Sequence, residues 1–125
     1  MKYLCLVYQD EEKIDALPQD EYDDILNDVL AYRDELQENG HYITSSPLQS
    51  VQSATTIRVR HGKMTITDGP FAETREQVGG FYLIEATDLN DAIRVASKMP
   101  PARIGTIEIR PLKEIHSNNR HPSSS

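Results

Sequence analysis

The pattern of apolar and polar positions predicts two strand–helix–strand units separated by a β-hairpin. Residues 2–8 are almost continuously apolar, which is typical of a strand covered on both faces near the middle of a sheet. Between Pro18 and Asn39 apolar side chains recur every three or four residues and predict one amphipathic helix. Pro18 suits a first helical position, and Gly40 suits the left-handed stop that follows a helix.

A β-hairpin is predicted in the middle of the chain. Residues 41–48 form a weaker strand, and the polar residues 49–54 follow it as a loop. Residues 55–60 and 63–67 then alternate around His61-Gly62, whose glycine and length indicate a tight turn. This turn places Arg60 opposite Lys63 and puts four apolar side chains on one side of the ribbon. They are Ile57, Val59, Met64 and Ile66.

The second unit comprises a strand over residues 78–85, a helix over 88–99 and a final strand over 104–110. Asp88 is expected to cap the helix, and Pro100-Pro101 to end it. Right-handed crossovers would place both helices on one face of the sheet. The predicted fold is therefore a ferredoxin-like α+β domain with an extra hairpin over residues 1–112, followed by a polar and mobile tail over 113–125.

Composition narrows the class of protein. A chain of 125 residues supports one core, and its net charge of −7 argues against nonspecific nucleic-acid binding. Residues 1–50 carry a charge of −9 and residues 51–125 a charge of +2. This asymmetry indicates either a solvated acidic helix or a basic strand surface for an anionic ligand.

Several classes of site and location are disfavoured by the sequence. No apolar run approaches the ~18 residues that span a bilayer, and no secretion signal is visible, so a cytoplasmic protein without membrane attachment is expected. The single cysteine, Cys5, lies in an apolar strand and is expected to be a buried hydrophobic residue. Scattered histidines and one cysteine give no metal-ligand spacing, so neither a metal nor a cofactor is predicted.

Alternation along the strands predicts a sheet with one apolar and one charged face. We expect helices to cover the apolar face, and the charged face to be open or covered by another subunit. Three arginines there, Arg58, Arg60 and Arg110, would bind a small anionic molecule, or would only pair with Glu108 and water. The apolar set comprises Ile57, Val59, Met64, Ile66, Ile107 and Ile109, and the polar set also includes Thr56, Thr65 and Thr67.

The segment over residues 68–80 concentrates candidate chemistry. Gly69 and Pro70 predict a sharp turn directly after Asp68. One of three carboxylates, Asp68, Glu73 or Glu76, could accept a proton if burial raised its pKa, with Arg75 holding an anion. The alternative is structural, with Asp68 bonding turn amides and Glu73 beginning a helical turn.

The stretch over residues 68–81, together with residues 1–3 and 106–111, resembles the DGPF branch of the YCII-related family, and the similarity extends to Leu112. The resemblance implies a homodimer in which two ferredoxin-like sheets face each other as a dimeric α+β barrel. Arg75 stands where the family commonly has lysine. The positions that match the recurring motif are Asp68, Gly69, Pro70, Phe71, Glu73, Glu76, Gly79 and Gly80.

A His–Asp pair is implied for better-studied relatives, but none of the four histidines could be matched to it. His41 could face a subunit cleft, whereas His61, His116 and His121 lie in a turn or near the polar tail.

Two functional hypotheses follow. The first is a cofactor-free enzyme of proton transfer, an isomerase or lyase acting on a small polar or anionic metabolite, with Asp68 as base. The second is a noncatalytic module that binds a ligand or a protein regulator, since relatives of the family are found joined to sigma-factor-type regulators. The sequence names no substrate.

Overall fold

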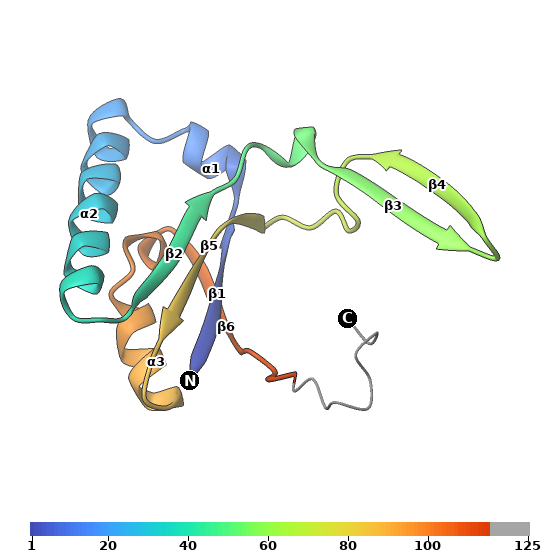
Figure 1. Cartoon of the computed structure of the whole chain (residues 1–125). Helices are drawn as coiled ribbons and strands as arrows, with labels where there is room; N and C mark the ends of the chain where they lie inside the picture. The colour runs from blue at the N-terminus through green and yellow to red at the C-terminus, as the bar shows by residue number, and fades with distance from the viewer. Residues whose placement is uncertain (116–125) are drawn as a thin grey trace.

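The fold is built on a four-stranded antiparallel sheet. The structure is a computed structural model that describes residues 1–115. The strand order is β2 (Tyr42–Pro47), β5 (Gln77–Glu85), β1 (Lys2–Gln9), β6 (Gly105–Pro111), with β5 and β1 in the centre (Figure 1). The prediction that the first strand lies near the middle of the sheet is thereby confirmed.

Helices cover one face of this sheet. The two long helices, α2 (Gln19–Glu38) and α3 (Leu89–Ser97), lie on the same side, together with the short helix α1 (Glu11–Asp15) (Figure 1). Asp88 caps α3 by accepting a hydrogen bond from the Asp91 amide at 2.8 Å, as expected. Two 3₁₀ turns, Val51–Ser53 and Pro100–Arg103, complete the described elements. The chain thus has the predicted ferredoxin-like α+β fold with an extra hairpin.

The core lies between the helices and the sheet. Alternate residues of β1, Tyr3, Cys5 and Val7, are buried there against Leu36 of α2 and Val95 of α3. Cys5 has no exposed surface, and burial raises the pKa of its thiol to about 11. The expectation that Cys5 is a small buried hydrophobic residue is therefore confirmed.

The other face of the sheet is only half-buried, so β1 is not fully covered on both faces within one chain. Leu4 and Leu6 lie on this open face between the helix-facing residues of β1. Phe81 and Leu83 occupy the opposing positions on β5. A homodimer with facing sheets would cover this face and stays a prediction.

The predicted hairpin forms with the predicted register. Strands β3 (Thr55–Arg60) and β4 (Lys63–Asp68) pair with Val59 opposite Met64 and Ile57 opposite Ile66. His61 and Gly62 both have positive φ, as a tight turn of this kind requires.

The expectation that the hairpin shares its two faces with the last strand is wrong. The hairpin is a separate two-stranded sheet, because both edges of β5 are already paired with β1 and β2. Ile107 and Ile109 of β6 pack against the core, whereas the apolar residues of the hairpin stay exposed. No helix among the described residues covers them.

Gly105 allows the two strands β1 and β6 to approach closely. A Cβ atom at this position would lie 2.2 Å from the backbone oxygen of Tyr8, which cannot move without displacing β1. At Gly79 a Cβ atom would instead meet the end of the Gln9 side chain, which can rotate away. The two glycines therefore differ in how much a methyl group disturbs the fold.

We expect Gly105→Ala to lower the free energy of unfolding by about 1–3 kcal/mol, because overpacking forces the strands apart. Gly79→Ala serves as the matched variant and should lower it by clearly less. Urea denaturation followed by circular dichroism measures both. Equal losses in the two variants would contradict the close approach at Gly105.

Candidate functional site

A cavity of about 440 Å³ is lined by residues of the sheet, α1 and the N-terminal half of α2. This volume is within the range of small-molecule sites in proteins. Its walls are mainly apolar and come from β1, β2, β5, α1, α2, the 3₁₀ turn Pro100–Arg103 and the loops near them. The apolar residues that line it include Val7, Ile14, Tyr22, Ile25, Leu26, Val29, Leu48 and Ile104.

The cavity exists because α2 packs closely on the sheet only at its C-terminal end. Leu36 is buried there, and the Tyr32 hydroxyl donates a hydrogen bond to the Val95 carbonyl oxygen at 2.7 Å. Toward the other end, Tyr22 and Leu26 line the cavity but remain partly exposed. The apolar stripe predicted for this helix thus serves as core at one end and as cavity wall at the other.

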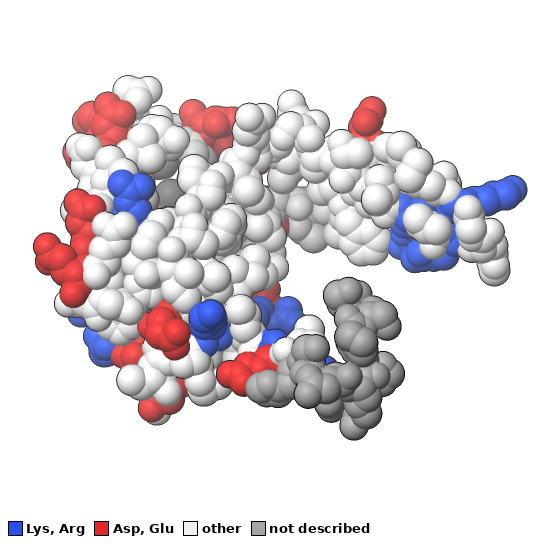
Figure 2. All heavy atoms as spheres, viewed as in Figure 1, with Lys and Arg blue, Asp and Glu red and all other residues white. Residues whose placement is uncertain are grey.

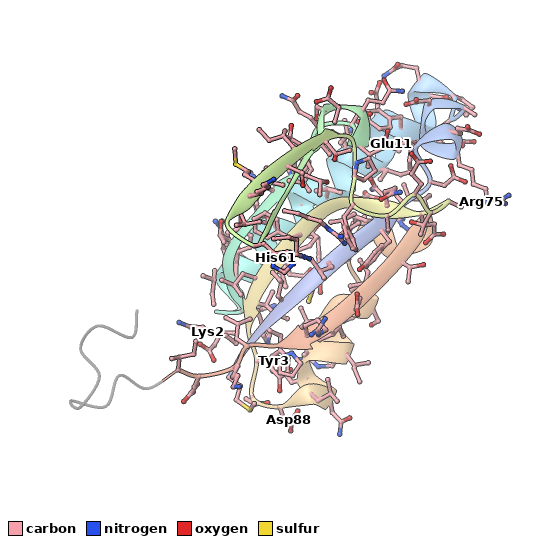
Figure 3. The ribbon with its side chains drawn as sticks, turned by 90° about the vertical axis from the view of Figure 1, so that its right-hand side faces the viewer. Lys2, Tyr3, Glu11, His61, Arg75 and Asp88 are labelled. Atoms are coloured by element: carbon pink, nitrogen blue, oxygen red, sulfur yellow. The ribbon has the colours of Figure 1, made fainter. Side chains whose placement is uncertain are left out.

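Helix α1 and the loop after β2 contribute polar groups to the cavity lining. The Glu11 carboxylate accepts hydrogen bonds from the Ser50 hydroxyl at 2.8 Å and from the Val51 amide at 2.9 Å (Figure 3). These bonds tie α1 to the loop between β2 and β3. Glu11 and Asp15 are the charged residues of the lining, which includes no lysine, arginine or histidine of the described chain.

The sheet side of the cavity includes the end of the DGPF-like segment. Gly79 and Gly80 line it, and the Leu48 amide donates a hydrogen bond to the Gly79 oxygen at 2.9 Å. A Cβ atom on Gly80 would lie 3.0 Å from the backbone oxygen of Ser46. These glycines keep β5 close to its neighbours, in agreement with the close backbone approach that glycine permits within a strand.

The turn predicted after Asp68 is confirmed. Gly69 has a φ of +104°, and its amide donates a hydrogen bond to the Ala54 oxygen at 2.7 Å. The Thr56 hydroxyl donates to the Gly69 oxygen at 2.8 Å. The base of the hairpin is therefore closed by backbone bonds of Gly69.

The three candidate carboxylates do not line the cavity. Asp68 and Glu73 are exposed, and the expected helical turn at Glu73 is absent because this part of the described chain forms only bends. Glu76 is half-buried and accepts a hydrogen bond from the Thr106 hydroxyl at 2.9 Å. Their role as proton acceptors stays a prediction.

The four candidate anion ligands lie in different places. Arg58 stacks on the Phe71 ring at 5.2 Å and lines a hollow of about 270 Å³ beside the hairpin. Arg60 lies at the end of β3, and Arg110 lies on β6 near Glu108 in the other sheet. Arg75 points away from the molecule (Figure 3). One chain does not bring these four together around a ligand, and anion binding by them stays a prediction.

A His–carboxylate contact that was not predicted from the sequence joins the loop after α2 to α3. His41 Nε2 lies 3.4 Å from the Asp91 carboxylate, and both side chains are mostly buried. Asp91 also accepts a hydrogen bond from the Thr87 amide at 3.0 Å and pairs with Arg94. Neither His41 nor Asp91 lines the cavity, so the pair holds structural elements together rather than facing a ligand there.

These partners lower the pKa of Asp91 and thereby make the stability of the fold depend on pH. The Thr87 amide, then Arg94 and His41, lower the pKa of Asp91 to about 2 against partial burial, which raises it. A carboxylate with a lowered pKa stabilises the fold above its ordinary pKa of 3.8, and this contribution is lost as the pH falls toward 2.

Asp91→Asn should therefore reduce the dependence of stability on pH between about 4 and 2, because the amide does not titrate. Denaturation midpoints of both proteins across this range test the expectation. Arg94→Ala removes one partner of Asp91, so the pH dependence of its stability should lie between those of wild type and Asp91→Asn. An identical pH dependence in wild type and Asp91→Asn would show that Asp91 is not responsible.

The residues that were not predicted from the sequence lie in a short helix or depend on a contact between distant parts of the chain. Glu11 lies in a helix of five residues, too short for an apolar stripe to show. Its only sequence signal is Asp10, which caps α1 by accepting from the Glu12 amide at 3.1 Å. Asp91 was visible only as an acid in the first turn of a helix, and nothing local indicated His41 as its partner.

Comparison with known proteins agrees with this fold and leaves the activity open. The model of the YCII-related domain matches residues 1–116. An uncharacterised protein, R00369, of Rhizobium meliloti (strain 1021) is 35% identical over 114 residues, which cover 90% of this chain and 92% of the relative. The chain therefore belongs to the YCII-related family, as the sequence indicated, whereas its place in the DGPF branch stays a prediction.

Two features of other protein classes are absent from the described residues. None of their helices is long and apolar enough to cross a membrane. They contain no group of three or more His, Cys, Asp or Glu side chains that could hold a metal ion.

Proposed function

We propose that this protein binds a small, mainly apolar molecule in the cavity between α2 and the sheet. The observation that carries the proposal is the cavity itself, with mainly apolar walls and a few polar groups in its lining. Such a lining is typical of sites in which apolar contacts supply affinity and a few polar groups fix orientation. This supports the ligand-binding alternative among the hypotheses drawn from the sequence.

The charges of the lining favour a particular class of ligand. Asp15 is an exposed carboxylate of the lining, and no basic residue of the described chain lines the cavity beside it. An amine or another hydrogen-bond donor on an apolar body would be attracted there, whereas a carboxylate would be repelled. The favoured ligand thus differs from the anionic molecule expected from the arginines.

Proton transfer has less support from this geometry. Both oxygens of Glu11 are already engaged by Ser50 and Val51, so this carboxylate acts as a tie between α1 and the following loop. Asp68, Glu73 and Glu76 lie outside the cavity lining. A protein regulator as partner, including a sigma-factor-type regulator, stays a prediction without a specific contact to support it.

Filling the cavity should abolish binding. The neutral fluorescent probe N-phenyl-1-naphthylamine is expected to bind wild type, and Ile25→Trp should lose this binding because Ile25 lines the cavity. Leu30→Trp is the matched control, since Leu30 lies on the same helix, is 50% exposed and is not in the lining. Fluorescence titration measures both, with circular dichroism to verify folding. Equal binding in the two variants would refute this location.

The preference for charge is tested with ligands of matched shape. We expect 3-phenylpropylamine to bind about tenfold more tightly than 3-phenylpropanoate, a difference of about 1.4 kcal/mol. Thermal shift at increasing ligand concentration measures the difference, and Asp15→Asn should reduce it. A stronger effect of the carboxylate would contradict the proposed ligand class while leaving the location of the site intact.

A further inference from the structure

The apolar side of the β3–β4 hairpin is exposed to an unusual extent for a folded ribbon. Ile57, Val59, Met64 and Ile66 are 60%, 58%, 60% and 61% exposed. They form one continuous side, because cross-strand partners lie on the same side of a ribbon. A two-stranded hairpin without further cover is only marginally stable in water. The apolar residues on this side of the hairpin therefore lack a packing surface within the described chain.

The neighbouring loop contacts the opposite, polar side of the hairpin. Phe71 packs under Arg58, and the hollow beside them is lined by Thr56, Thr65 and Thr67. These residues alternate with the apolar ones and so face the other way. Within the described chain, Phe71 therefore contacts part of the polar side of the hairpin, whereas the four apolar residues on the other side stay exposed.

The hairpin projects from the side of the sheet that faces away from the helices. Figure 1 shows it extending outward from the body, and Figure 3 shows it in front of the sheet. The half-buried residues Leu4 and Leu6 lie on this same side of the sheet. One partner approaching from this direction would therefore reach both the open sheet face and the hairpin.

We propose that the hairpin is an arm whose apolar side packs against a second copy of this chain. A two-fold pair of copies would give each protomer one arm to offer and one surface to receive the partner's arm. Strands of six residues extend about 20 Å, whereas two packed sheets lie about 10 Å apart. The arm is thus too long to end between two facing sheets and continues along the flank of the partner.

Charge supports a second copy as the occupant. The free end of the arm carries Arg60 and Lys63, with Arg58 close behind, in a chain of net charge −7. Figure 2 shows the basic end of the hairpin on one side of the molecule and acidic groups along the helices on the other. The arm of one copy would then meet the acidic helix side of its partner, and this attraction would weaken with salt.

The arm contact differs from the facing-sheet homodimer expected from the sequence, because that dimer would need no hairpin. It is also independent of the proposed ligand site, none of whose lining residues lies on the hairpin. Failure of one proposal therefore leaves the other standing.

The test is the association of the full chain, measured by sedimentation equilibrium at low and high salt. Wild type should dimerise, and Val59→Thr/Met64→Thr should raise the dimer Kd at least tenfold, because it makes one exposed cross-strand pair polar while keeping residues that suit a strand. Thr56→Ser/Thr67→Ser changes a pair on the other side of the same ribbon and should leave the Kd unchanged. Circular dichroism verifies that all variants fold.

A second variant tests the charge of the arm. Arg60→Glu/Lys63→Glu should weaken the dimer at low salt and remove most of the dependence of Kd on salt. An unchanged Kd in Val59→Thr/Met64→Thr would overturn the proposal and assign association to the sheet faces alone. A monomeric wild type at all concentrations would also overturn it, and binding of that monomer to phosphatidylglycerol vesicles would assign the arm to a membrane surface instead.

Discussion

The attachment of α2 to the sheet at its C-terminal end determines where this molecule has internal space. Leu36 fills the layer between helix and sheet at that end, and Tyr32 bonds across to α3. Farther along the helix the layer widens and is not filled by side chains. The short helix α1 and the loop after β2, held together by Glu11, close part of the opening. A ferredoxin-like core therefore contains a cavity without any change in its topology.

The segment over residues 68–80 has two structural roles rather than one. Its first residues close the base of the hairpin, where Gly69 adopts a positive φ and bonds to Ala54. Its last residues, Gly79 and Gly80, belong to β5 and form part of the cavity wall. A motif that unites a hairpin base and a strand of the core explains why turn residues and glycines occur so close together. It does not by itself require a reaction at the acids between them.

Much of the fold could be predicted because its signals are local. The alternation in the hairpin and its His61-Gly62 turn determine the register, and Asp88 marks the beginning of α3. The separation of the hairpin from the main sheet was not predictable in this way. It depends on which strands occupy the edges of β5, and this is a property of the whole sheet. For the same reason, the sequence did not show that Arg58 and Arg110 lie in different sheets, although both occupy polar positions of alternating strands.

The candidate site was less predictable than the fold. A cavity arises from side chains that fail to meet, and no residue pattern records such a gap. Tyr22 and Leu26 carry the same periodic signal as Leu36, although only Leu36 is fully buried. Glu11 binds a loop that follows it by about forty residues, and its role could be found only from the coordinates. Helical periodicity indicates which side of a helix is apolar, but not how closely that side is packed.

The separate hairpin also bears on how the chain avoids aggregation. The outer edges of β3 and β4 are unpaired within the described residues, and such edges can pair with strands of other molecules. The apolar residues of the ribbon would add to this tendency. Arg58, Arg60 and Lys63 place positive charges along these short strands, so that two hairpins approaching edge to edge repel each other. The basic residues of this otherwise acidic chain thus protect an element that has open edges and exposed apolar side chains.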